Sequence, residues 1–442
     1  MKEKVIQFGS GNFLRAFADE FIDGLNKKGL FDGSVVVVQS TSSKTGDIIN
    51  SQNGKYRLLI RGVENGKNVD SMREINCISR CVNANTEFDG FLSLARNPDT
   101  EFIISNTTEA GIKYDSSCRF SDRPQSSFPG KLTRFLYERF KSGLGGFTLL
   151  PCELIDNNAD ALRDCVLKYS RQWELGEDFI EWTLSENSFC NTLVDRIVSG
   201  FPKNESEALF ERIGERDMLL DVAEPYHLWV IEGNVEDRLP LKKGGVNVIW
   251  TDSVARYKKR KVRVLNGSHT SLVFPAMLCD VKTVDEAISD NQLSEFLHKC
   301  LYGCILPVLG EDKSNISFAE SVLERFANPY LGHRWESISL NSVSKFSARV
   351  LPTVDDIMRQ SGEAPVLLCF SLAGLIYYYK TREPNDIESA VRFIKENALC
   401  DILANADLWG EDLSCLLPTT GLCFDKIDKL GIREALKWVL SL

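Results

Sequence analysis

The first half of the chain alternates short apolar runs with longer amphipathic stretches. Residues 5–8 form an apolar run, a turn with Gly9 and Gly11 follows, and Phe17, Phe21 and Leu25 then recur at helical spacing. The next run, residues 35–38, consists of four consecutive valines, which is typical of a parallel strand buried on both faces. Further runs at residues 102–105 and 147–150 repeat the pattern. This strand–helix alternation predicts an α/β fold with a doubly wound parallel sheet.

Polar or glycine-rich residues follow three of the predicted strands. The carboxyl ends of strands in an open α/β sheet face the ligand crevice, and a glycine turn lets backbone N–H groups approach a pyrophosphate. The candidate dinucleotide contacts are therefore Phe8, Gly9, Gly11, Asn12, Phe13, Gln39, Asn106 and Thr107. Leu14 occupies the third glycine position of the usual fingerprint, so an ordinary strand–helix turn is the alternative for the first motif. A plain turn is the alternative for Asn106 and Thr107.

The type of dinucleotide is not decided by the second strand. An acid after this strand usually binds the ribose 2′-hydroxyl, whereas a base accommodates a 2′-phosphate. Here Gln39 is followed by hydroxyl residues and then by Lys44, with no acid. At this position both NAD and NADP are compatible with the sequence.

The second half of the chain is predominantly helical in pattern. We expect a nucleotide-binding domain over residues 1–245 and a mostly α-helical domain over residues 246–442, which suits a chain too long for a single core. Near the start of the second domain, Lys261, Asn266 and His269 interrupt an apolar run. On an α-helix at about 100° per residue, Asn266 lies about 140° and His269 about 80° from Lys261, so the three project from one side. They could converge on one small molecule, although a core helix with a snorkelling lysine is the simpler alternative.

Composition and charge limit which partners, cellular compartment and metal sites we expect for this protein. A net charge of −10 argues against a nucleic-acid partner and means that an anionic substrate needs local cations. No leader and no apolar run of about 18 residues is present, so we expect a cytoplasmic protein with no membrane partner. Thirteen cysteines lie mostly in apolar runs, as expected for free thiols, and the pairs Cys77/Cys81 and Cys300/Cys304 lack the further ligands of a zinc site. We therefore expect no bound metal.

The polar set near residue 261 resembles a signature of the mannitol dehydrogenase family, which comprises polyol-specific long-chain dehydrogenases and reductases. In that signature a lysine is followed five residues later by an asparagine and three residues later by a histidine, as in Lys261, Asn266 and His269. The family's glycine turn followed by phenylalanine and arginine is similar to the segment with Phe13 and Arg15. The resemblance covers nearly the whole chain. It implies a Rossmann-type domain followed by a helical domain, NAD as cofactor, and no metal.

The resemblance also implies roles for individual residues. Lys261 would donate a proton to the substrate oxygen during reduction and accept it during oxidation, Asn266 would donate a hydrogen bond to the same oxygen, and His269 would orient a neighbouring hydroxyl. A second asparagine from the first domain would be Asn158, although the adjacent Asn157 is an alternative.

The implied substrate is a sugar acid or a polyol. The closest resemblance within the family is to its branch for keto-uronates such as tagaturonate, with fructuronate reduction and mannitol oxidation as alternatives. The carboxylate of a uronate needs a placed cation, for which Arg349 and Lys345 are the candidates; a surface or bridging role is the alternative. A nucleotide-binding protein without catalysis is another hypothesis, but binding alone requires no lysine–asparagine–histidine set. The oligomeric state cannot be read from the sequence.

Overall fold

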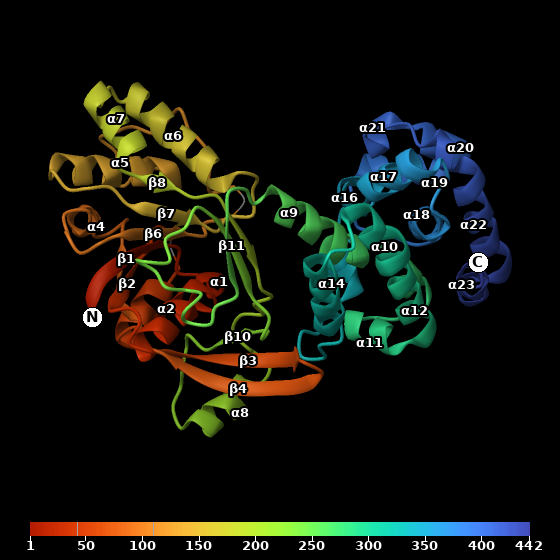
Figure 1. Ribbon diagram of the computed structural model, residues 1–442, viewed down its shortest axis with the longest axis horizontal. Coiled ribbons are helices and arrows are strands. Elements are labelled where there is room, and N and C mark those ends of the chain that lie inside the picture. Colours follow the sequence, from red (N-terminus) through yellow and green to blue (C-terminus); the bar gives the residue numbers. More distant parts are fainter. Residues whose placement is uncertain (42, 109) are drawn as a thin grey trace. The chain divides into compact units, whose positions relative to one another are not determined.

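The computed structural model describes residues 1–41, 43–108 and 110–442, which form two compact units (Figure 1). Unit 1 comprises Met1–Arg61 and Asn68–Ala255, and unit 2 comprises Gly62–Lys67 and Arg256–Leu442. The boundary expected after residue 245 lies shortly before the observed division. The reason is that strand β12 (Val248–Thr251) pairs with β11 (Leu228–Glu232) and so belongs to unit 1.

Unit 1 is organised around a six-stranded sheet in the order β5-β2-β1-β6-β7-β8. Every neighbouring pair is parallel, which confirms the predicted doubly wound sheet. The chain reverses direction across the sheet between β1 and β6, the point where ligands bind in such folds. The strands are β1 (Lys2–Phe8), β2 (Gly33–Gln39), β5 (Ile78–Asn83), β6 (Phe102–Ser105), β7 (Thr148–Pro151) and β8 (Ser188–Phe189).

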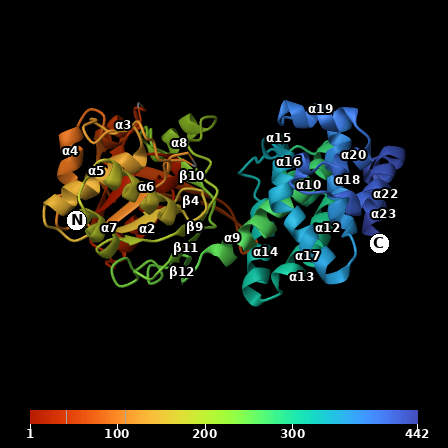
Figure 2. The same cartoon turned by 90° about the horizontal axis from the view of Figure 1, so that it is seen from above.

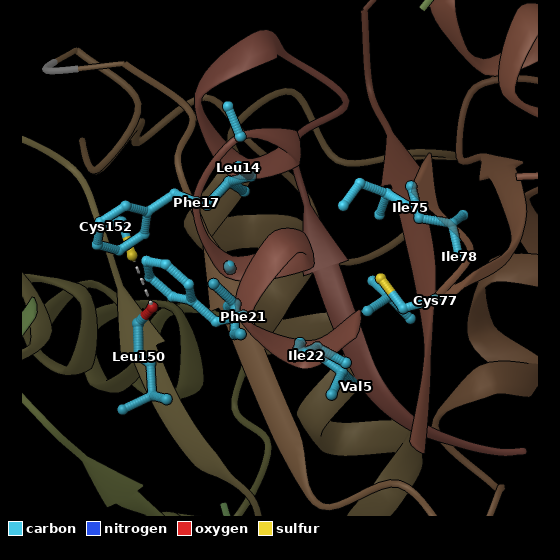
Figure 3. Packing of buried hydrophobic residues seen from close by; sticks show 14 of the residues in the cluster. Val5, Leu14, Phe17, Phe21, Ile22, Ile75, Cys77, Ile78, Leu150 and Cys152 are labelled. Atoms are coloured by element: carbon cyan, nitrogen blue, oxygen red, sulfur yellow. Dashed lines mark hydrogen bonds between the residues drawn. The ribbon is translucent and has the colours of Figure 1, made fainter. Parts of the chain in front are cut away.

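Two hydrophobic clusters cover the two faces of this sheet because side chains alternate along each strand. Val35 and Val37 of β2 join one cluster, whereas Val36 and Val38 join the other. The first cluster contains Phe17 and Phe21, which are labelled in Figure 3. The ring centroid of Phe17 lies 5.2 Å from that of Trp229. Burial on both faces explains the continuous valine run.

Helices and two smaller sheets complete unit 1. The smaller sheets have the orders β10-β3-β4 and β12-β11-β9. Their remaining strands are β3 (Tyr56–Glu64), β4 (Lys67–Ile75), β9 (Thr192–Asp195) and β10 (Asp221–Ala223). The helices are α1 (Asn12–Arg15), α2 (Ala18–Lys27), α3 (Thr45–Ser51), α4 (Phe88–Leu94), α5 (Phe128–Lys141), α6 (Asn158–Gln172), α7 (Glu177–Ser185) and α8 (Ser206–Ile213).

The amphipathic stretch after the glycine turn is two helices rather than one. The chain leaves the helical conformation at Phe17, where φ is −135° and ψ is −90°. Two buried side chains bind the carbonyl groups at this break: Tyr56 Oη donates to Arg15 O at 2.6 Å, and Arg196 Nη1 donates to Ala16 O at 2.7 Å. The break is stable because these distant residues replace the missing helical hydrogen bonds.

Unit 2 is helical, as predicted, and is built around α18 (Val366–Thr381). This helix packs against α10 and α22 (Figure 2). Most of its residues are apolar, which is typical of a helix that is surrounded by other helices. The other elements are α9 (Ala255–Lys261), η1 (Val262–Asn266), α10 (Gly267–Leu278), α11 (Val284–Ser289), α12 (Asn291–Cys300), η2 (Leu301–Ile305), α13 (Leu306–Leu309), α14 (Lys313–Phe326), α15 (Trp335–Ile338), α16 (Ser342–Arg349), α17 (Leu351–Ser361), α19 (Glu388–Glu396), α20 (Leu399–Ala404), α21 (Ala406–Trp409), η3 (Ser414–Leu416), α22 (Leu417–Leu430) and α23 (Ile432–Leu440).

The glycine turn after β1 gives a prediction about stability. Gly9 has φ +125°, and a Cβ atom there would lie 2.8 Å from the backbone oxygen of Asn106. Gly11 has φ −71°, and nothing lies within 4 Å of its would-be Cβ. We therefore expect Gly9→Ala to reduce the free energy of unfolding by about 1–3 kcal/mol or more, and Gly11→Ala to change it by about 0.5 kcal/mol or less. Urea unfolding of both variants measures this, and equal effects would contradict it.

A second prediction concerns Asp19 of α2, whose carboxyl is fully buried. Burial raises the pKa of Asp19 from its ordinary 3.8 to about 7. The folded protein therefore keeps a proton that the unfolded chain releases, so this group lowers the free energy of unfolding as the pH rises from about 4 to about 7. We expect Asp19→Asn to be more stable than the wild type by about 2 kcal/mol at pH 7.5, and by much less at pH 4.5. Urea titrations at both pH values measure the difference in the free energy of unfolding between Asp19→Asn and the wild type. An equal difference at the two pH values would contradict the prediction.

Candidate active site

A cavity of about 890 Å³ lies in unit 1 at the carboxyl ends of β1, β2 and β6. This is the reversal point of the sheet, and the volume is typical of cofactor sites. Six of the predicted dinucleotide contacts line the cavity: Phe8, Gly9, Gly11, Gln39, Asn106 and Thr107. The glycine turn fits a dinucleotide because Gly9 and Gly11 line the cavity without side chains, which lets backbone groups approach a pyrophosphate.

Two of the predicted contacts, Asn12 and Phe13, are not among the residues that line this cavity. The Asn12 side-chain oxygen accepts a hydrogen bond from Arg15 Nη2 at 2.7 Å. The Phe13 ring stacks on Phe17 with centroids 5.0 Å apart and packs against the first hydrophobic cluster. In this geometry both side chains support the turn.

Arg15 fixes the backbone of the glycine turn through a hydrogen bond and an ion pair. Its guanidinium is buried, donates to Ser10 O at 2.8 Å and pairs with Asp221 at 3.4 Å. Burial raises the pKa of Asp221 to about 7, and the charge of Arg15 opposes that rise. The arginine of the N-terminal motif thus fixes the backbone that faces the cavity.

The loop after β6 is held by a buried acid that the sequence reasoning did not single out. Glu153 accepts hydrogen bonds from Ser105 Oγ and from the backbone N–H and hydroxyl of Thr107, each at 3.0 Å. Asn106 Nδ2 donates to Cys152 O at 2.7 Å. Burial raises the pKa of Glu153. These bonds fix the positions of Asn106 and Thr107, so the backbone and the Thr107 hydroxyl are the groups presented to a ligand.

Gln39 also uses its amide within the protein. Its Nε2 donates to Thr41 O at 3.0 Å and to Ser43 O at 2.6 Å, and its Oε1 accepts from Gly46 N at 2.6 Å. The side chain therefore shapes the loop after β2, and the hydroxyl residues of that loop line the cavity. Whether Gln39 itself contacts a ribose stays a prediction.

Asn158 is almost fully buried at the start of α6. Its Nδ2 lies within hydrogen-bond distance of Pro151 O, Glu153 O and Thr192 O, at 2.9, 3.1 and 3.1 Å. Both N–H groups are thus donated inside unit 1, and a bond to a substrate oxygen would have to replace one of them. The alternative, Asn157, is exposed and has the left-handed φ of +48°.

In unit 2, the Lys261–Asn266 segment contains a π-helical turn rather than the regular α-helix assumed from the sequence. Lys261 ends α9, η1 covers Val262–Asn266, and Gly267 N–H donates to Val262 O, five residues back. The angles of a regular α-helix therefore do not apply between Lys261 and Asn266, and a common side for Lys261, Asn266 and His269 stays a prediction. Turns of this type occur often at functional sites.

His269 lies in α10, three residues beyond the end of η1, and is buried among aromatic rings. It stacks on Phe326 with centroids 4.1 Å apart, and its ring is perpendicular to that of His333 at 5.2 Å. Burial, then the charges of His333, Arg325 and Arg349, lower its pKa well below the ordinary value, so the imidazole is neutral. Its Nε2 atom is buried and has no hydrogen-bond partner within the described ranges.

The two predicted carboxylate-binding cations lie on α16. Lys345 Nζ donates to Ile338 O at 2.9 Å. Arg349 is half-buried, and no hydrogen bond or ion pair of its guanidinium occurs with the residues that the structure describes. The Arg349 carbonyl would lie 3.2 Å from a Cβ at Gly267, so α16 crosses close to the start of α10. Burial lowers the pKa of Arg349.

Over residues 1–41, 43–108 and 110–442, no cluster of three or more histidine, cysteine, aspartate or glutamate side chains is placed to hold a metal ion. Within the same ranges, no helix has the length and apolar character needed to cross a membrane.

Solved structures with the same fold include D-sorbitol dehydrogenase in its substrate-free form, with a TM-score of 0.88 and 22% identity over 99% of this chain and 95% of that chain. Mannitol 2-dehydrogenase of Pseudomonas fluorescens, solved with NAD and D-mannitol, gives a TM-score of 0.75 and 21% identity over 100% and 95% of the two chains.

Curated relatives are closer in sequence. Altronate oxidoreductase of Bacillus subtilis (strain 168) is 40% identical over 98% of this chain and 95% of its own length. That of Halalkalibacterium halodurans is 39% identical over 100% and 94%. The mannitol dehydrogenase Rossmann domain matches residues 3–243, and the mannitol dehydrogenase C-terminal domain matches residues 253–414. The chain therefore belongs to the mannitol dehydrogenase family of oxidoreductases.

Proposed function

We propose that the chain is an NAD(H)-dependent oxidoreductase that reduces a keto-uronate, tagaturonate, to altronate and also catalyses the reverse oxidation. The observation that carries the proposal is the set of Lys261, Asn266 and His269 around a π-helical turn, in a chain about 40% identical to altronate oxidoreductases. NAD supplies or accepts the hydride when it is bound in the cavity of unit 1. The residues of this chain bind, orient and exchange the proton.

The three polar side chains suit the three needs of carbonyl reduction. Lys261 donates its proton to the carbonyl oxygen as negative charge develops there, and accepts it again during oxidation. The amide of Asn266, which makes no side-chain hydrogen bond with the described residues, donates to the same oxygen. His269 is neutral and binds the hydroxyl next to the reacting carbon through Nε2. For the second asparagine, Asn158 is the sequence-based choice and Asn157 the alternative.

The charges around His269 support an acidic sugar over a neutral polyol. Arg325 and Arg349 both act on its pKa, so two guanidinium groups lie near the proposed substrate hydroxyl. Arg349 has a half-buried guanidinium that pairs with no carboxylate of the described residues, and such a group is suited to a bidentate bond with a ligand carboxylate. Fructuronate carries the same charge and is the nearest alternative, whereas mannitol oxidation requires no such cation.

Substitution of the lysine separates catalysis from binding. We expect Lys261→Ala to reduce kcat by about 10²–10⁴-fold, because proton transfer is lost. NADH affinity should stay within about twofold, because the proposed NADH site is lined only by residues of unit 1. Stopped-flow turnover and NADH fluorescence titration measure the two effects. Lys259→Ala, an exposed neighbour on α9, is the matched control. An equal loss of NADH binding and turnover would identify Lys261 as a structural residue.

A substrate panel on the wild type and Arg349→Met tests the choice of sugar. With NADH, the wild type should reduce tagaturonate faster than fructuronate or fructose, and NADPH should be a poorer donor. Arg349→Met should raise KM for tagaturonate by about 10- to 100-fold, the effect of losing hydrogen bonds to a charged group, and leave any reduction of neutral fructose unchanged. Arg359→Met, an exposed arginine of α17, is the control. Preference for fructuronate, or for fructose, would instead support the corresponding alternative.

A further inference from the structure

Lys131 is a buried cation that faces the cavity of unit 1 and has no assigned role. It lies in the first turn of α5, its exposed fraction is 5%, and it lines the same cavity as Gly9, Ser10 and Gly11. No hydrogen bond or ion pair of its ammonium group occurs with the described residues. Buried lysines are nearly always paired, so an unpaired one that lines an open cavity indicates an anionic ligand.

Among the residues that the structure describes, no carboxylate pairs with Lys131. Asp115 lines the same cavity, but its carboxylate accepts hydrogen bonds from Ser117 Oγ at 2.6 Å and Ser126 Oγ at 2.7 Å and forms no ion pair with Lys131. The buried Cys118 lies close enough to act on the pKa of the lysine. Burial lowers the pKa of Lys131. An anion in the cavity would offset this effect.

The glycine turn is followed by a helix too short to neutralise a pyrophosphate. In related folds the partial charge at the N-terminus of the first helix performs this task. Here α1 has four residues and the chain then breaks at Phe17, so few peptide dipoles are aligned. By contrast α5 has 14 residues, is capped by Ser127, and presents Ser127 and Phe128 to the same cavity. Its N-terminal end and Lys131 provide the positive potential that α1 lacks.

We propose that the Lys131 ammonium group binds the pyrophosphate of the dinucleotide and compensates for the interrupted first helix. The inference rests on the proposed use of NAD, and is independent of which sugar is reduced. It makes Lys131 a cofactor-binding residue whose charge is unfavourable in the empty fold and favourable in the complex.

Measuring the affinity of the wild type and of Lys131→Met for NADH, ADP and adenosine tests this role. We expect the variant to bind NADH and ADP about 10- to 100-fold more weakly than the wild type, because both carry a diphosphate. Adenosine, which carries none, should bind equally well. The Tm of the ligand-free variant should be unchanged or higher, because the substitution removes a buried unpaired charge. Lys141→Met, an exposed lysine at the end of the same helix, is the matched control and should behave as the wild type.

The other outcomes separate this inference from the proposed function. Equal affinity of wild type and Lys131→Met for ADP would overturn the role of Lys131 and leave NAD use intact. A lower Tm of Lys131→Met, with parallel losses of ADP and adenosine binding, would show that Lys131 has a packing role and would also overturn its role in binding the diphosphate. In that case Lys131→Arg should fail to restore ADP affinity. If the wild type binds neither NADH nor ADP, the proposed cofactor is wrong and this inference falls with it.

Discussion

The close approach of two backbones, at Gly9 after β1 and at Asn106 after β6, is the constraint on which unit 1 depends. Gly9 N–H donates to Val38 O, Asn106 N–H donates to Phe8 O, and a side chain at residue 9 would meet the Asn106 carbonyl at 2.8 Å. The ends of three neighbouring strands are thereby held together where the sheet reverses direction. A glycine at residue 9, with φ +125°, is what allows the ends of β1 and β6 to approach each other this closely beside the cavity.

Most polar side chains around that cavity stabilise the loops that form it. Arg15, Gln39, Glu153 and Asn158 each bind backbone groups, and all four are buried. Buried polar groups must be satisfied, so their partners fix the loops in one conformation. The groups that line the cavity include backbone, several hydroxyl groups and the buried cation Lys131. In unit 2, Asn266 and Arg349 make no side-chain hydrogen bond with the described residues, and they lie on η1 and α16, which pack against each other.

The reach of sequence reasoning differs between the two sites. In unit 2 the spacing of Lys261, Asn266 and His269 predicts a site whose role stays a prediction, and the conformation between the first two residues is a π turn rather than the assumed α-helix. In unit 1 the glycine turn and the strand ends correctly located the cavity. Asn12 and Phe13, adjacent in sequence to lining residues, nonetheless point elsewhere.

The sequence by itself determined the features that depend on neighbours along the chain: the alternation of strands and helices, the glycine turn and the polar set after Lys261. The tertiary structure decided the features whose partners are distant. The break between α1 and α2 requires Arg196, 180 residues away from Ala16, and the isolation of Lys131 depends on Asp115 being bound to two serines. Local pattern fixes which residues can face one another within an element, whereas the hydrogen bonds and charges that a buried group meets depend on how remote segments pack.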